Sequence, residues 1–134
     1  MPVATVGDTA SHEVQVTDEA IDAFAELSGD ENPIHLDDAY AAETLFGGRV
    51  AHGMLSAAAV SGALASLPGD IVYLEQELSF TAPVRPGETV RATVEVIEDL
   101  GEDRLRVRTA AFVDARDERV LDGEATILSL AHEE

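Results

Sequence analysis

The pattern of hydrophobic and polar residues changes about halfway along the chain, from helical to extended spacing. From Thr17, a favourable N-cap, to Ser28, apolar residues recur at i, i+3 and i+4, which predicts an amphipathic helix. Gly29 stands where a C-terminal cap is expected. Asp37 is predicted to cap a second short helix through 39–45, which the following pair of glycines ends.

A third helix is predicted from Gly53 to Leu67, and this segment is apolar or small on every side. The sequence Pro-Gly-Asp at 68–70 closes it as a turn. A helix that is apolar all round has to be buried, and about 15 residues are too few to cross a bilayer. We therefore expect the rest of the chain to supply the surface that buries it.

Residues 71–130 supply that surface, because they predict four strands separated by turns at 83–88, 100–103 and 115–118. Short turns give antiparallel pairing, and a twisted antiparallel sheet with one apolar face can curl around the long helix. The alternating stretch at 12–16 provides a further strand. The predicted fold is α+β: a hotdog fold in which a curved five-stranded antiparallel sheet wraps a long central helix, as one domain over residues 1–134.

Composition narrows the possible chemistry. The chain has 134 residues, 46% of them hydrophobic, which is enough for the core of one domain. It has neither an apolar run of membrane-spanning length nor a recognisable signal peptide, so we expect a soluble, cytoplasmic protein. Cysteine is absent, which excludes disulfides, thiolate metal sites and a cysteine nucleophile. Catalysis would have to use carboxylates, imidazoles or hydroxyls.

The chain is strongly acidic, with a net charge of -19 from 27 acidic and 8 basic residues, and every basic residue is arginine. Binding to nucleic acid or to an anionic membrane depends on basic charge, so the balance argues against both partners. It favours a halophilic protein adapted to molar salt, where a short Debye length screens repulsion between carboxylates. Plain solubility is the alternative.

The segment 28–35 carries the first group of chemically active side chains. Asp30 and His35 flank a polar loop, and Pro33 favours an extended conformation at Asn32. The loop can therefore direct Asp30, Asn32 and His35 into one space. A carboxylate beside an imidazole can hold a water molecule and move its proton. Alternatively, the segment is a plain turn in which Asp30 caps backbone amides.

A second group lies in the segment 49–54, which leads into the long helix. Free amides of its first turn, Gly53 among them, lie at the positive end of the helix dipole and can stabilise an oxyanion. Alternatively, Gly53 only permits close packing. Ser61 lies two turns further on, where its hydroxyl needs a partner or bonds the carbonyl at i-4.

These motifs resemble those of the MaoC-like family, specifically its single-domain (R)-specific enoyl-CoA hydratases. The resemblance covers about 14–130, and its specific part is Gly29-Asp30-Glu31-Asn32-Pro33-Ile34-His35, then His52-Gly53-Met54 and Ser61-Gly62. It implies that Asp30 and His35 activate water, that Asn32 fixes the loop, that Ser61 lies beside the pair, and that the Gly53 amide receives the thioester oxygen.

The resemblance also implies a reaction and partners. An acyl-CoA is the substrate: trans-2-enoyl-CoA is hydrated reversibly to (R)-3-hydroxyacyl-CoA, with no metal or redox cofactor, supplying polyhydroxyalkanoate monomers or serving fatty-acid metabolism. A homodimer is expected, because two copies of a five-stranded sheet can pair their open edges, with each long helix against the other subunit's active-site region.

The remaining charged residues carry weaker expectations. Arg49 and Arg85 lie nearest the loops expected to face substrate and are candidates for binding coenzyme A phosphates, with an ordinary solvated role as the alternative. His12 and His132 are expected at the surface, and His52 is taken as structural. Three other functions stay open: a hotdog thioesterase, a non-catalytic partner subunit, and a dehydratase acting on carrier-protein substrates.

Overall fold

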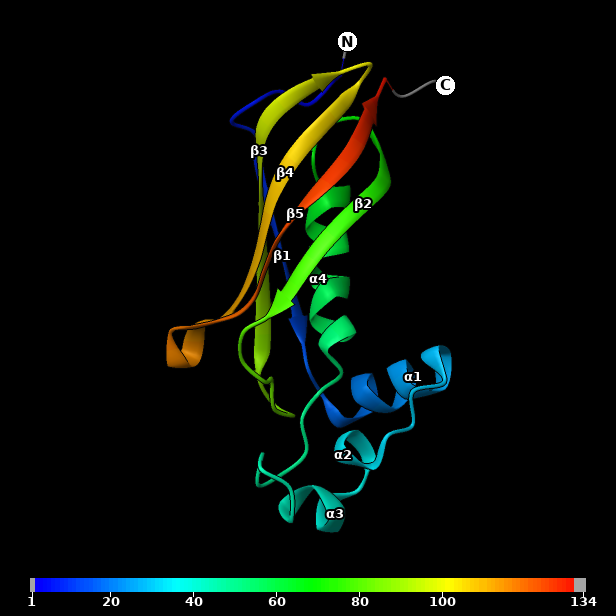
Figure 1. Ribbon diagram of the computed structural model, residues 1–134, viewed down its shortest axis with the longest axis vertical. Coiled ribbons are helices and arrows are strands. Elements are labelled where there is room, and N and C mark those ends of the chain that lie inside the picture. The colour runs from blue at the N-terminus through cyan, green and yellow to red at the C-terminus, as the bar shows by residue number, and fades with distance from the viewer. Residues whose placement is uncertain (1, 132–134) are drawn as a thin grey trace.

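The computed structural model describes residues 2–131 and contains a five-stranded antiparallel sheet that curves around one long helix (Figure 1). The strand order in the sheet is β1-β3-β4-β5-β2. The strands are β1 (Thr9–Gln15), β2 (Asp70–Phe80), β3 (Thr89–Gly101), β4 (Arg104–Val113) and β5 (Glu118–Leu130). The α+β hotdog prediction is confirmed, together with the four strands expected over 71–130.

The central strands follow the period-2 pattern of their sequence. In β3 the side chains at 90, 92, 94 and 96 are buried and those between them are less so. A tight turn joins β3 to β4, and its residues Glu102 and Asp103 both have positive φ, which two-residue hairpin turns of this hand require. The 3-10 helix η1 (Asp114–Arg116) and Asp117, also at positive φ, join β4 to β5.

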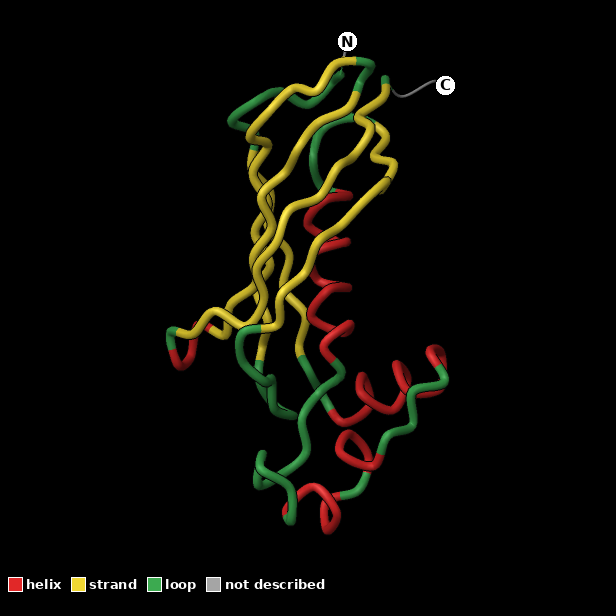
Figure 2. Tube along the Cα trace, in the orientation of Figure 1, coloured by secondary structure: helices red, strands yellow, loops and turns green. Residues whose placement is uncertain are grey.

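The long helix α4 (Gly53–Ala65) lies against the concave face of the sheet, as Figure 2 shows, and this interface holds the core. Val60 and Leu64 of the helix pack with sheet residues such as Leu105 and Ile127. The expectation that the rest of the chain buries the whole helix is wrong. A sheet wraps only one side, and the opposite side remains exposed: Met54, Ala58, Ser61 and Ala65.

Three shorter helices gather at the end of the molecule opposite the termini (Figure 1). They are α1 (Asp18–Ser28), α2 (Pro33–Leu36) and α3 (Asp38–Ala42). Thr17 and Gly29 cap α1 as predicted, and the Asp37 side chain accepts a hydrogen bond from the Tyr40 amide at the start of α3. The sequence interpretation missed α2 and extended α3 too far.

The reasons are local. The Asn32 side chain accepts a hydrogen bond from the Ile34 amide, and Pro33 occupies the first turn, so an N-cap followed by proline starts α2. α3 ends early because the Thr44 amide and hydroxyl both bond the carbonyl of Ala41 and turn the chain. Within residues 2–131 we find no helix with the length and hydropathy needed to cross a bilayer.

Candidate active site

Asp30 lies in the loop between α1 and α2, and its side chain is 52% exposed. Gly29 precedes it with φ of 78°, a left-handed conformation that suits glycine and ends α1. The Asp30 amide donates to the Ser28 hydroxyl, and one Asp30 carboxylate oxygen accepts from the Asn32 amide at 3.3 Å. Asn32 therefore organises this loop from both sides, as the cap of α2 and as a partner of Asp30.

His35 projects from α2 and is buried, with 7% of its surface exposed. Its Nδ1 lies 2.7 Å from the carbonyl oxygen of Val50. Because a carbonyl only accepts, Nδ1 carries a hydrogen, and in the neutral ring the lone pair is then on Nε2. That Nε2 lies 3.9 Å from the Asp30 carboxylate, so the structure brings together the two side chains that the sequence selected.

His52 directly precedes α4 and joins this pair. Its ring stacks on that of His35, with centroids 3.9 Å apart and planes 28° from parallel. Asp30, His35 and His52 offer ligand atoms within 4.8 Å of one another, the spacing of a possible metal site. A metal binds in the plane of an imidazole, and the lone pairs of two stacked rings do not converge. The donor set therefore does not suit a metal ion.

A cleft of about 500 Å³ opens beside the two imidazoles. His35, His52 and Gly53 line it together with mostly apolar side chains: Ile34, Phe46, Val50, Ala51, Met54, Ser56, Phe80, Thr81, Ala82, Pro83, Val84 and Val120. No side chain caps the first turn of α4, so its amides at this end have no partner of that kind. The cleft thus combines apolar walls, a base and the positive end of a helix.

The Phe80 ring explains one constraint at Gly53. A Cβ atom on Gly53 would lie 2.9 Å from the nearest carbon of that ring. Phe80 is 51% exposed, so it can rotate away from an added methyl group. Sequence reasoning missed Phe80 because an apolar residue at the end of a strand carries no distinctive signal. The contacts of His52 could not be predicted from the sequence, although its place next to Gly53 was a signal that it lies near the site.

Ser61 does not join the site within one chain. It lies on the exposed side of α4, two turns beyond Gly53, and does not line the cleft. Among the described residues its hydroxyl has no hydrogen-bond partner, and the bond to a carbonyl at i-4 belongs instead to Ser66. Its neighbour Gly62 lies against the ring of His12 on β1, where a Cβ atom would come within 2.6 Å.

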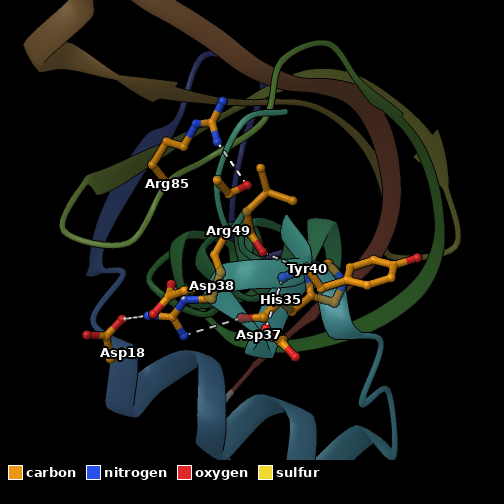
Figure 3. A network of polar contacts seen from close by, with 9 residues as sticks. Asp18, His35, Asp37, Asp38, Tyr40, Arg49 and Arg85 are labelled. Carbon is orange, nitrogen blue, oxygen red and sulfur yellow. Dashed lines mark hydrogen bonds and ion pairs between the residues drawn. The ribbon is translucent and has the colours of Figure 1, made fainter. Parts of the chain in front are cut away.

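Arg49 and Arg85 both have protein partners (Figure 3). The Arg49 guanidinium bonds the carboxylates of Asp18 and Asp38. Burial opposes its charged form, but the two carboxylates outweigh this and raise the pKa of Arg49. Arg85 donates to the carbonyl oxygens of Phe46 and Gly48. Both arginines thus hold the segment before α4, and phosphate binding by either one stays a prediction.

Relatives of this chain are similar to it in sequence over most of its length. A 3-hydroxybutyryl-CoA dehydratase from Methylorubrum extorquens is 45% identical over 124 residues, covering 91% of this chain and 78% of the relative. An (R)-specific enoyl-CoA hydratase from Rhodospirillum rubrum is 42% identical over 91% of this chain and 85% of its own.

Solved structures of (R)-hydratases have the same fold as this chain. The R-hydratase PhaJ1 from Pseudomonas aeruginosa superimposes with a TM-score of 0.87 at 40% identity, over 98% of this chain and 88% of that one. The (R)-hydratase from Aeromonas caviae gives 0.86 at 36% identity, over 93% and 96%. Residues 3–115 match the family described as MaoC like domain. This chain belongs to the MaoC-like domain family.

Proposed function

We propose that this protein is an (R)-specific enoyl-CoA hydratase, a hydro-lyase that adds water to a trans-2-enoyl-CoA and releases it in the reverse direction. The relatives named above carry this activity or the corresponding dehydration. The observation that carries the proposal is that Asp30 lies 3.9 Å from His35, and His35 lines a cleft that Gly53 at the start of α4 also lines.

The separation of the pair suits one bound water molecule. A water oxygen at a hydrogen-bond distance of about 2.8 Å from each partner fits between atoms that are 3.9 Å apart. In our proposal Asp30 accepts one water hydrogen and orients the molecule. The Nε2 of His35, which bears the lone pair of the neutral ring when Nδ1 donates to Val50, takes the other proton.

Hydration then proceeds by addition of the water oxygen and protonation of the resulting enolate. The water oxygen forms a bond to C3 of the enoyl group, the C2–C3 π electrons move toward C1, and the thioester oxygen becomes an enolate. The amide of Gly53, at the positive end of α4, stabilises that oxygen. The proton held at the Asp30–His35 pair is delivered to C2 as the thioester carbonyl re-forms, which restores both side chains.

A role in polyhydroxyalkanoate supply follows from the same proposal. The (R)-hydratase from Aeromonas caviae is described as involved in PHA biosynthesis. An (R)-3-hydroxyacyl-CoA is the monomer that such a polymerisation consumes, so we propose the same destination for the product here.

We also propose a homodimer. Within residues 2–131, strand β2 lies at one edge of the sheet and pairs with β5 alone, and its apolar side chains at 72–74 are each about 40% exposed. The open side of α4, including Met54 and Ser61, is a second surface that a symmetric copy can cover. Ser61 then becomes a candidate for contact with the partner's site. Light scattering at micromolar concentration tests this proposal, and a stable monomer would refute it.

The decisive functional experiment follows two reactions, hydration and thioester hydrolysis, in parallel on each substrate. Loss of absorbance at the enoyl-thioester band is followed with crotonyl-CoA, hexenoyl-CoA and longer substrates, and release of free coenzyme A thiol is followed in parallel. Hydration without thiol release supports the hydratase, whereas thiol release identifies a thioesterase. Crotonyl thioester on a carrier protein provides the third arm, which separates carrier-protein from coenzyme A substrates.

A further inference from the structure

His52 is the most buried of the polar side chains around the cleft, with 2% of its surface exposed, and the mechanism above assigns it no step. Its Nε2 lies 2.8 Å from the carbonyl oxygen of Asp30. Because that carbonyl only accepts, Nε2 carries the hydrogen and donates it. The remaining ring nitrogen, Nδ1, is buried and has no hydrogen-bond partner among residues 2–131.

A capping role does not account for these contacts. His52 occupies the N-cap position of α4, yet its side chain forms no hydrogen bond to that helix. It turns instead toward the loop that carries Asp30. The side chain of Asp30 is 52% exposed, so it gains little orientation from packing. The hydrogen bond from His52 therefore fixes the backbone of a residue whose carboxylate is otherwise held by its own loop.

The faces of the His52 ring are also used. His35 stacks on it at 3.9 Å between centroids, and the ring of Phe24 from α1 meets it edge-on at 4.8 Å. One residue thus contacts α1, the Asp30 loop and α2. The next residue in the chain is Gly53, whose amide begins α4. His52 therefore links the water-activating pair to the amide that faces the thioester oxygen.

We propose that His52 is a positioning residue that sets the distance between the Asp30–His35 pair and the Gly53 amide through its hydrogen bond to the Asp30 carbonyl. The inference rests on the proposed hydratase function. The water must lie over C3 while the thioester oxygen lies at Gly53, and a displacement of about 1 Å between two such points can cost about 100-fold in rate.

Two substitutions separate the hydrogen bond from the ring. His52→Gln keeps an N–H donor of similar reach, and His52→Phe keeps an aromatic ring against His35 and Phe24 but cannot donate. We expect His52→Phe to lower kcat by about 10- to 100-fold with KM changed by less than about threefold, because the geometry of the reacting groups is disturbed rather than the cleft. His52→Gln should retain kcat within about fivefold.

The opposite pattern would overturn the inference. A wild-type kcat in His52→Phe would refute the role. Equal losses of kcat in His52→Phe and His52→Gln would also refute it if thermal melting shows that both losses are due to unfolded protein. If His52→Phe does not fold, His52→Asn replaces it, since its shorter amide cannot reach the Asp30 carbonyl. Equal kcat for Asn and Gln would then refute the role. Failure of the wild-type protein to hydrate crotonyl-CoA would instead refute the proposed function, independently of His52.

Discussion

The sheet with α4 and the helical segment 17–52 differ in how far they depend on the burial of apolar side chains. In the first region nearly every inward side chain is apolar and buried, from Val90 in β3 to Ile127 in β5. In the second, the helices are short, and Leu27 and Leu45 are 86% and 91% exposed. A few apolar side chains, such as Ile21, are buried here, and caps, ion pairs and backbone hydrogen bonds hold the rest, including the bonds of Arg49 and His35.

This difference separates stability from chemistry. Burial of apolar surface supplies most of the favourable free energy of folding, and the larger part of the buried core lies in the sheet and α4. Of the two groups proposed to act on water, Asp30 is half exposed, so its loss removes little buried area, whereas His35 is buried and held by a polar contact with Val50. Substitutions in the two regions should therefore affect different measurements, which the following predictions test in order of decreasing effect.

The largest effect is expected from Asp30→Asn and His35→Ala. Each removes a group proposed to hold or move the water proton, so kcat should fall by about 10²- to 10⁴-fold. The melting temperature should change little for Asp30→Asn, whereas His35→Ala removes a buried ring and should lower the melting temperature without preventing folding. Initial rates with crotonyl-CoA and thermal melting check the two halves of this statement. Because both groups act on one water, the double variant should be scarcely slower than the slower single variant. Multiplying losses would contradict a shared site.

The sequence predicted the region governed by burial better than the region governed by polar contacts. Alternation along β3 and β4 identifies the buried residues because the side-chain period in a strand is fixed. Asp30 and His35 could also be predicted as a pair, because they belong to one short motif. The contacts of His52 with Asp30 and Phe24 were not, because they join segments that only the folded chain brings together.

The exposed side of α4 shows a second limit of the sequence. Its composition predicted burial on every side, but composition alone could not say how much of the helix the sheet of the same chain would cover. Similarly, α2 was missed because four residues are too few to show helical periodicity, although the Asn32-Pro33 pair is a recognisable start signal.

The second prediction concerns the core. Leu105 of β4 is fully buried between sheet and helix, so Leu105→Ala should lower the free energy of unfolding by about 2–5 kcal/mol. The folded fraction should keep a normal kcat. Denaturant unfolding and rates per folded molecule provide the measurements. Leu27→Ala is the matched control, with an expected change within about 0.5 kcal/mol. A large loss there would mean that even the exposed apolar side chains of the helical region contribute to stability.

The third prediction decides why residue 53 is glycine. In Gly53→Ala the added methyl group should rotate the half-exposed Phe80 ring and crowd the thioester oxygen. We expect kcat/KM to fall about tenfold or more with a melting temperature close to wild type. If close packing were the only reason for glycine, activity would instead decline in proportion to the folded fraction.

The fourth prediction concerns salt, which acts on both regions through the net charge of -19. The Debye length falls from about 10 Å at 0.1 M to about 3 Å at 1 M, so repulsion between carboxylates weakens over this range. Melting temperature, dimer fraction and rate with anionic coenzyme A substrates should all rise with KCl, and NaCl controls for ion identity. Equal stability and activity at both ends would leave the acidic surface as a solubility feature.

The smallest effect is expected at Glu88, an ionic contact within the sheet region. Its carboxylate bonds the Arg116 guanidinium and accepts from the Arg85 amide, and its side chain is 19% exposed. The hydrogen bond from Arg116 outweighs burial and lowers the pKa of Glu88. A carboxyl with a lowered pKa in the folded state contributes stability above its unfolded pKa, near about 4.3. That contribution disappears as pH falls through the lower folded value.

Glu88→Gln should therefore cost about 1 kcal/mol at pH 7, and the two melting curves should converge in acid. Glu77→Gln removes the same charge from an exposed position on β2 and should cost nothing. A gap between Glu88→Gln and wild type that persists unchanged in acid would mean that Glu88 acts through packing, and the sheet region would then depend on burial alone.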